Sequence, residues 1–260
     1  LVAMGLEPHV FLRPKSNLWR IVDISRDIVI HENDLTDPDT VRAIIQKIRP
    51  TIIYHLVAHG AYSSQIDARR ILEVNLMGTL NLLQALETVD YKLMVNTGAS
   101  SEYGFKNHPM KENDIPSPNS YYSVSKISQT LLCQYTANSQ NKNIVTFRLF
   151  SAYGPYEDPN RLVPTLIRSC LSNKDLNMVS PQTARDFIYI DDVIDAYLMV
   201  ESLMKQAGEI FNIGSGIQTT IKGITEQVIS LTNANVPVHW NAMSPQIWDA
   251  STWVGDIAKA

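Results

Sequence analysis

Cysteine and charge are both scarce in this sequence of 260 residues. The two cysteines, Cys133 and Cys170, fall within segments of helical pattern, which excludes a disulfide framework and predicts a reducing, cytoplasmic location. Charged residues make up 18% and the formal net charge is -4, so a basic surface for nucleic acid or membranes is not expected. No apolar run approaches the ~20 residues of a membrane helix.

Hydrophobic residues make up 45% of the chain, which is enough to bury a substantial core. Short apolar, β-branched runs alternate with helical patterns, one of which can begin at Asp37-Pro38 and end before Pro50. Parallel strands need crossover connections, so this alternation predicts an α/β fold with a doubly wound parallel sheet. The strand-like runs are residues 10–12, 28–30, 52–57, 93–95 and 144–147, and two longer helical patterns span about 67–88 and 121–139.

The alternation loosens after Gly154-Pro155, where prolines become frequent. Beyond them we expect a helix at 191–206, a strand at 210–213 and a helix at 219–232. The sequence therefore predicts two domains, residues 1–155 and a smaller C-terminal domain at residues 156–260, with some later elements returning to the sheet.

Tyr122 and Lys126 are four residues apart in a helical pattern, so their side chains share one face. A nearby ammonium favours the phenolate and lowers the tyrosine pKa, which would let Tyr122 exchange a proton with a substrate hydroxyl. Such pairs also occur by chance, with the ring packed on the aliphatic stem. The polar stretch from Asn96 to Ser101, which follows a strand, favours the chemical interpretation because ligands of open α/β sheets bind at the carboxyl ends of strands.

The chain resembles the extended short-chain dehydrogenase/reductases, the group that contains nucleotide-sugar epimerases, dehydratases and ketoreductases. Each matching motif is weak alone, but together they occur in order and at the usual distances. The resemblance implies a Rossmann-like fold. The motifs are Asp34-Leu35, Tyr54 to Ala58, Asn75 with Gly78-Thr79, Ser100 to Gly104, Tyr122 to Lys126, Arg148 to Pro155, Arg185-Asp186-Phe187 with Asp191-Asp192-Val193, and Asn212 to Gly216.

The resemblance also implies roles for single residues. Tyr122 is similar to the general acid/base, and Lys126 to the lysine that lowers its pKa and holds the nicotinamide ribose. Asp34 and Leu35 resemble the pair that contacts adenine, although Asp34 is equally typical of a turn. Further cofactor contacts are implied for Val57, Ala58, Asn75 and Phe150, and substrate contacts for Ser151, Leu162, Val163 and Arg185. Arg185 suits a phosphate, or could instead pair with Asp186.

The sequence departs from the family pattern in two places. The family has a glycine-rich turn that holds the cofactor pyrophosphate, but the eleven glycines of this sequence include no such cluster. Truncation of the sequence is the favoured explanation. The catalytic hydroxyl of relatives lies four residues before the tyrosine of the Tyr-Gly pair, where this chain has Ala99. Either Ser100, our candidate, or Thr97 substitutes for it, or the enzyme is impaired.

The expected function is an NAD(P)-dependent nucleotide-diphosphate-sugar epimerase or 4-keto-sugar reductase, acting as a homodimer. A 4,6-dehydratase is the nearest alternative, but the positions of its acidic pair hold Ser100 and Ser101. A non-catalytic dinucleotide-binding scaffold is another. Arg13, at the end of the strand at 10–12, slightly favours NADP over NAD, unless it stacks on adenine or only solvates a turn.

Other conspicuous residues are expected to be structural. His55 and His59 have no evident third ligand, so no metal site is predicted. The tryptophans Trp240, Trp248 and Trp253 are expected to pack against the smaller domain rather than to form a stacking platform.

Overall fold

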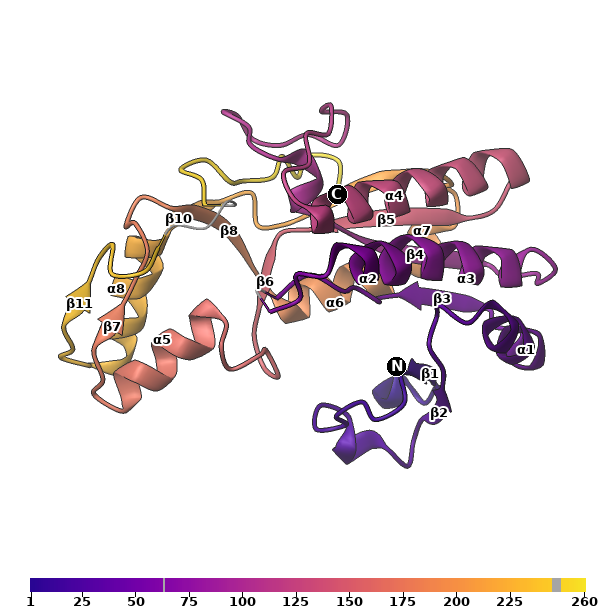
Figure 1. Ribbon diagram of the computed structural model, residues 1–260, viewed down its shortest axis with the longest axis horizontal. Helices are drawn as coiled ribbons and strands as arrows, with labels where there is room; N and C mark the ends of the chain where they lie inside the picture. Colours follow the sequence, from indigo (N-terminus) through magenta and orange to yellow (C-terminus); the bar gives the residue numbers. More distant parts are fainter. Residues whose placement is uncertain (63, 245–248) are drawn as a thin grey trace. The chain divides into compact units, whose positions relative to one another are not determined.

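The computed structural model of the protein describes residues 1–62, 64–244 and 249–260, so Trp248 lies outside the described residues. Strands and helices alternate along most of the chain (Figure 1). The strands are β1 His9–Leu12, β2 Val29–Glu32, β3 Ile52–His55, β4 Leu93–Ala99, β5 Ile144–Leu149, β6 Ser151–Tyr153, β7 Leu176–Asn177, β8 Ala184–Tyr189, β9 Ile210–Ile213, β10 Gln218–Thr220 and β11 Val238–His239.

The helices account for most of the remaining structure. Three short 3-10 turns lie at Val2–Met4, Val22–Ile24 and Ser100–Tyr103, and a π-helical turn lies at Glu73–Met77. The α-helices are α1 Pro38–Ile48, α2 Ala68–Leu72, α3 Gly78–Leu86, α4 Tyr121–Gln140, α5 Leu162–Leu171, α6 Ile190–Leu198, α7 Val200–Leu203 and α8 Ile221–Thr232.

Parallel pairing dominates the N-terminal strands, as the sequence predicts. β1 pairs with β2 and β3 pairs with β4, both in parallel, and the largest sheet has the strand order β3-β4-β5-β9. The expected α/β fold with a parallel sheet is therefore confirmed. β8 pairs in parallel with β6 and antiparallel with β10.

The chain forms two compact units that are interleaved along the sequence. The first unit comprises Leu1–Thr97, Val124–Thr146 and Glu201–Glu209. Its apolar core includes Val41 of α1 and Leu86 of α3, both essentially inaccessible to solvent. Helix α1 begins as expected, because the Asp37 side chain accepts a hydrogen bond from the Thr40 N–H at 3.2 Å and Pro38 needs no partner there.

The second unit comprises Gly98–Ser123, Phe147–Val200 and Ile210–Ala260. Within it α5 and α8 pack together beside the β7–β11 pair (Figure 1), and Leu166 is fully buried in that cluster. A second cluster joins Tyr103, Met110, Phe150 and Trp253. The predicted division at residue 155 into cofactor-binding and substrate-binding parts stays a prediction, because these units reflect compactness and not ligand binding.

Several predicted elements differ in detail from the structure. The helical pattern at 67–88 is divided into α2, the π-helical turn and α3, and the pattern at 191–206 is interrupted at Met199 between α6 and α7. The strand at 210–213 and the helix near 219–232 are confirmed as β9 and α8. Among the described residues, no helix is long and apolar enough to cross a membrane.

Candidate functional site

The start of helix α4 is held by local hydrogen bonds. The Ser120 hydroxyl accepts a hydrogen bond from the Ser123 N–H at 3.1 Å, and the Ser123 hydroxyl accepts one from the Ser120 N–H at 2.9 Å. This reciprocal arrangement satisfies donors at the helix terminus and fixes where the helix begins. Tyr122 therefore lies in the first turn of α4, and Lys126 lies one turn later on the same face.

The Lys126 side chain is buried, with 1% of its surface exposed. Its ammonium donates hydrogen bonds to the Thr97 carbonyl near the end of β4 and to the Gln129 side-chain oxygen at 2.5 Å. A buried charge is tolerated only when it is paired or hydrogen-bonded in this way. The ammonium is thus held in one position at the carboxyl end of a central strand.

Asn75 links this part of α4 to a neighbouring loop. Its amide oxygen accepts a hydrogen bond from the His59 N–H at 2.7 Å, and its amide nitrogen donates to the His59 carbonyl and to the Ser125 hydroxyl, each at 2.8 Å. Asn75 is 1% exposed, so these contacts are shielded from water. The predicted cofactor residue therefore lies next to Ser125, the neighbour of Lys126.

The Tyr122 phenol is in a different electrostatic state from the one expected. Burial raises the pKa of Tyr122 to about 12, the Glu102 carboxylate adds to that rise, and Arg161 opposes it. The expectation that Lys126 lowers this pKa is not met, because burial is the largest cause and raises the pKa, and the charge that lowers it comes from Arg161. At neutral pH the phenol therefore carries its proton and can donate it.

Ser100 directly follows β4, and its hydroxyl is defined by one contact. The indole N–H of Trp253 donates a hydrogen bond to the Ser100 hydroxyl oxygen at 3.2 Å, and Ser100 is 8% exposed. The preceding Ala99 N–H donates to the Glu102 carboxylate at 2.8 Å. Ser100, the candidate catalytic residue, and Ala99, which replaces the catalytic hydroxyl of relatives, are thus adjacent, and hydrogen bonds hold both.

Glu102 and Arg148 form a buried ion pair beneath that turn. The Arg148 Nε donates to the Glu102 carboxylate at 2.8 Å, and the side chains are 2% and 0% exposed. The Arg148 guanidinium also lies 4.5 Å from the centre of the Tyr103 ring. Removing either partner of such a pair leaves an uncompensated buried charge, which makes the motif structurally demanding.

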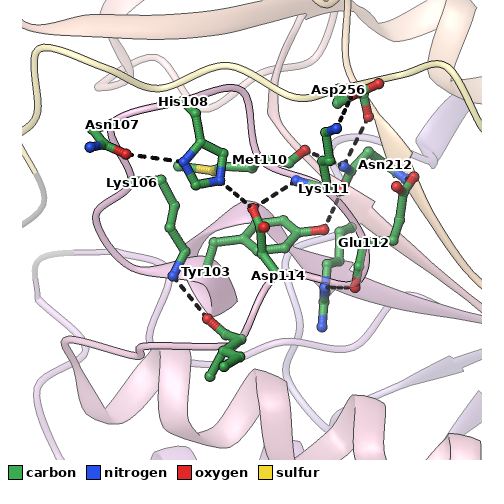
Figure 2. Close-up of polar contacts among 12 residues, drawn as sticks. Tyr103, Lys106, Asn107, His108, Met110, Lys111, Glu112, Asp114, Asn212 and Asp256 are labelled. Atoms are coloured by element: carbon green, nitrogen blue, oxygen red, sulfur yellow. Dashed lines mark hydrogen bonds and ion pairs between the residues drawn. The ribbon is translucent and has the colours of Figure 1, made fainter.

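The same network continues through Tyr103 to Asn212 (Figure 2). The Tyr103 hydroxyl donates to the Asn212 side-chain oxygen at 2.7 Å, and the Asn212 amide nitrogen donates to the carbonyls of Met110 at 2.8 Å and Asp256 at 3.0 Å. The Asn212 N–H donates to Glu112 at 2.9 Å. Two motifs that are more than 100 residues apart in the sequence are therefore joined by buried hydrogen bonds.

The predicted adenine-contacting pair lies after β2. The Asp34 carboxylate accepts hydrogen bonds from Arg70 at 2.6 Å and from the Thr36 N–H at 3.0 Å. Burial raises the pKa of Asp34, but the bonds from Thr36 and Arg70 outweigh it, and the pKa lies below its usual value. Leu35 is buried in the core of the first unit.

The residue before this pair is an unexpected feature. Asn33 is 5% exposed, and neither atom of its side-chain amide has a hydrogen-bond partner among the described residues. A buried amide without partners is energetically unfavourable unless a ligand or water completes it. Sequence reasoning missed Asn33, because nothing in a single asparagine beside Asp34 signals burial.

The other predicted cofactor residues of the first unit lie at strand ends. Val57 packs partly against the core, whereas Ala58 is exposed. Arg13 directly follows β1 and is exposed. Burial lowers the pKa of His59, and Arg13 and Arg70 lower it further, so these positive groups act on the same imidazole. The Asp67 carboxylate acts on His59 in the opposite sense.

The predicted substrate residues belong to the second unit. Ser151 opens β6 opposite Phe187 of β8, and Leu162 and Val163 open α5, where Val163 is buried in the core. Phe150, predicted to contact the nicotinamide, is 6% exposed and packs with Trp253 in the second cluster.

Arg185 does not pair with its neighbour Asp186. Its guanidinium donates to Asp249 at 3.0 Å and to the Ala184 carbonyl at 2.7 Å. Burial lowers the pKa of Arg185, and Asp249 opposes that effect. Asp186 instead accepts a hydrogen bond from the Ser215 N–H at 2.7 Å. The alternative of an Arg185–Asp186 pair is therefore wrong, and Asp249 lay too far along the sequence for any pattern to reveal it.

His55 and Trp240 are engaged in structural contacts. The His55 ring hydrogen-bonds to the Thr79 hydroxyl at 2.8 Å, and burial lowers the pKa of His55 to about 3, with Lys126 contributing. No cluster of three metal-binding side chains is found in the described part of the chain. Trp240 packs partly against the core formed by α5 and α8, as expected.

Comparisons with known proteins agree with this picture. Residues 6–214 match the sequence model of the NAD dependent epimerase/dehydratase family. The GDP-6-deoxy-D-mannose reductase of Pseudomonas aeruginosa is 27% identical over 246 residues, which cover 90% of this chain and 79% of that protein.

Two solved structures illustrate the shared fold. The UDP-glucose 4-epimerase of Thermotoga maritima, solved with UDP-glucose, superposes with a TM-score of 0.87 at 21% identity, covering 99% of this chain and 84% of that one. The UDP-glucose 4-epimerase of Thermus thermophilus, solved with NAD, gives a TM-score of 0.86 at 23% identity, covering 99% and 85%.

Proposed function

The chain belongs to the NAD-dependent epimerase/dehydratase family, and from this premise we propose that it is an NAD(P)-dependent enzyme of nucleoside-diphosphate sugars, acting as an epimerase or a 4-keto-sugar reductase. The observation that carries the proposal is the position of Tyr122 on α4, one turn before the Lys126 ammonium, which is buried and held by hydrogen bonds. The similarity to a sugar-nucleotide reductase and to UDP-glucose epimerases supports the substrate class.

The proton of Tyr122 serves the reduction step that both activities share. Both activities include reduction of a keto sugar, in which the sugar oxygen must receive a proton. Because its pKa is raised to about 12, the phenol of Tyr122 holds that proton at neutral pH and delivers it to the oxygen. Ser100, with its hydroxyl oxygen held by Trp253, is proposed to hydrogen-bond to the same oxygen.

The position of Glu102 argues against a 4,6-dehydratase. Water elimination requires a second acid and base besides the tyrosine. Glu102 is the one carboxylate of the Ser100 to Gly104 motif, and it is fully buried in its ion pair with Arg148. Engaged in this way, it is unsuited to exchange protons with a sugar.

The residues of the first unit fit one part of a dinucleotide. A bound nicotinamide supplies the site that gives and takes a hydride. Lys126 would hold the adjoining ribose, and the unpartnered amide of Asn33 offers a buried donor and acceptor at the carboxyl end of β2, where open α/β sheets bind ligands. Asp34 would reach an adenine only by sharing its carboxylate with Arg70.

NADP is the cofactor we propose, with NAD as the alternative. Arg13 directly follows β1, where a 2′-phosphate would be read, and its charge acts on the His59 imidazole. We also propose a cytoplasmic location, because the chain has only two cysteines, both free and buried, and so lacks a disulfide framework.

A homodimer is also proposed. Val124, Leu131 and Tyr135 are exposed along one face of α4, and the only charged residue of this helix, Lys126, is buried. An exposed apolar stripe without charge fits a second copy of the same surface. We expect Leu131→Asp to shift the protein from dimer to monomer in analytical ultracentrifugation, and a monomeric wild type would contradict the proposal.

Turnover of defined substrates tests the catalytic assignment. We expect the wild type to epimerise a nucleoside-diphosphate sugar or to reduce its keto form, as measured by chromatography of the products. Tyr122→Phe should lower the rate by a factor of ~10²–10⁴ and change the cofactor affinity by no more than a few fold. Tyr121→Phe, at the exposed neighbouring tyrosine, is the matched control. Lys126→Met should also weaken cofactor binding. Cofactor binding without turnover of any sugar would instead favour the non-catalytic scaffold.

A further inference from the structure

Trp253 contacts two of the residues proposed to act on the substrate. Its indole N–H donates to the Ser100 hydroxyl at 3.2 Å, and the Arg185 guanidinium lies 5.6 Å from the centre of its ring. Trp253 is 5% exposed, so both contacts occur away from bulk water. One side chain thus connects the candidate catalytic hydroxyl with the candidate phosphate ligand.

The contact with Ser100 uses part of the acceptor capacity of its hydroxyl. An indole nitrogen can only donate, so the Ser100 oxygen must be the acceptor. The Ser100 hydroxyl donates to none of the described residues. Its hydrogen is therefore available to an oxygen of a ligand, and the indole N–H occupies one of its two lone pairs, which favours the donor role.

The contact with Arg185 affects the other end of the substrate. The guanidinium is attracted to the ring face, and Asp249 fixes it from a second direction at 3.0 Å. A planar guanidinium held in one orientation loses less conformational freedom when it binds a phosphate. The contact between Arg185 and Trp253 requires the aromatic ring but not the indole N–H.

The backbone around Trp253 is itself held in place. The Trp253 N–H donates to the Gln218 side chain at 3.0 Å, and the Gly255 N–H donates to the buried Asp186 carboxylate at 3.1 Å. The intervening Val254 carbonyl accepts from the Met110 N–H at 2.8 Å. The indole is thus presented by a rigid segment, as a positioning group requires.

We propose that Trp253 is a positioning residue, which orients the Ser100 hydroxyl as a hydrogen-bond donor to the sugar and holds the Arg185 guanidinium for the nucleoside diphosphate. This inference rests on the proposed function, because it assigns Ser100 and Arg185 to the same substrate. It goes beyond the expected packing of Trp253, which the cluster with Tyr103, Met110 and Phe150 shows.

Two substitutions separate the two effects. Trp253→Phe keeps a ring beneath Arg185 but removes the N–H, and it should lower kcat about three- to tenfold with little change in KM, as for loss of one hydrogen bond. Trp253→Leu also removes the ring, and it should in addition raise KM and weaken binding of the free nucleoside diphosphate about two- to fivefold. Trp240→Phe is the matched control, because Trp240 is partly buried against the core formed by α5 and α8.

A double-mutant cycle tests whether Trp253 acts through Ser100. If it does, Trp253→Phe lowers kcat in the wild type but has no further effect in Ser100→Ala. A purely structural role would lower the unfolding midpoint and give additive rate effects, so thermal unfolding is measured for every variant. Trp253→Tyr, which also lacks the indole N–H, replaces the phenylalanine variant if that protein does not fold.

The outcomes distinguish this inference from the function it rests on. Wild-type turnover with additive losses, or with no loss in Trp253→Phe, overturns the positioning role and leaves the enzyme assignment intact. No turnover with any nucleoside-diphosphate sugar overturns the proposed function and the role at Ser100 with it. In that case calorimetric titration with the free nucleoside diphosphate still tests the role at Arg185. Equal affinity of the wild type and Trp253→Leu overturns that role, and weaker binding by Trp253→Leu supports it.

Discussion

Gly104→Ala is expected to destabilise the protein far more than Gly5→Ala, although both glycines have a positive φ. Gly104 ends the turn Ser100–Tyr103 with φ 65° and ψ −151°, a combination that is essentially restricted to glycine. Gly5 has φ 75° and ψ 18°, the left-handed conformation that other residues adopt at moderate cost. Both substitutions strain the backbone, but only a Cβ at Gly104 also meets neighbouring atoms, so comparing them isolates the steric effect.

The surroundings of the two glycines set the size of the difference. A Cβ at Gly104 would lie 1.8 Å from the Ser117 carbonyl oxygen, which cannot move alone because the Ser117 N–H donates to the Tyr103 carbonyl at 3.2 Å. Strain of ~1–3 kcal/mol and forced overpacking of ~1–3 kcal/mol give a loss of ~2–6 kcal/mol. A Cβ at Gly5 has no atom within 4 Å. There the ~1–2 kcal/mol of strain is partly offset by ~0.4–1 kcal/mol from the stiffer unfolded chain.

Unfolding in urea and on heating, followed by circular dichroism, measures both variants. We expect a large fall in both midpoints for Gly104→Ala and a small one for Gly5→Ala. Because the turn carries Ser100, the residual folded fraction of Gly104→Ala should also turn over more slowly. Equal destabilisation of the two variants would refute the reasoning, since it would mean that the Ser117 carbonyl does not exclude a methyl group.

Three further predictions concern pH, the vacant hydroxyl and the cofactor. The pKa of His55 is about 3 in the folded protein and 6.5 in the unfolded chain, so its contribution to stability is complete above pH 6.5 and is lost as the pH falls towards 3. The fall in melting temperature on acidification should therefore be shallower for His55→Asn than for the wild type. Ala99→Ser should raise kcat if the missing hydroxyl limits the rate, whereas no gain, together with a slower Ser100→Ala, would show that Ser100 already fills the role. Arg13→Ala should lower the NADP/NAD affinity ratio about tenfold in cofactor titrations, and tighter binding of NAD by the wild type would contradict the proposed preference.

Much of the local structure could be predicted from neighbouring residues. The start of α1 at Pro38 follows from an aspartate cap and a proline, both of which act within one turn of the chain. The shared face of Tyr122 and Lys126 follows from helical geometry alone. The parallel pairing of β3 with β4 follows from the helical segment between them.

The partners of the site residues could not be predicted in this way. Arg185 has an aspartate beside it in the sequence, yet it pairs with Asp249, because neighbouring side chains on β8 point to opposite faces. Asp186 therefore reaches the backbone of a distant segment at Ser215. Which residues meet across the fold depends on the packing of the strands, which no short window of sequence contains.

The sequence by itself determined the fold class, the order of most elements and the spacing of the Tyr122–Lys126 pair, because these depend on periodicity and local geometry. Only the tertiary structure decided that the Tyr122 pKa rises through burial and that the Ser100 oxygen accepts a hydrogen bond from the Trp253 indole. Burial and the choice of hydrogen-bond partner arise from segments that are far apart in the chain and meet only when it folds.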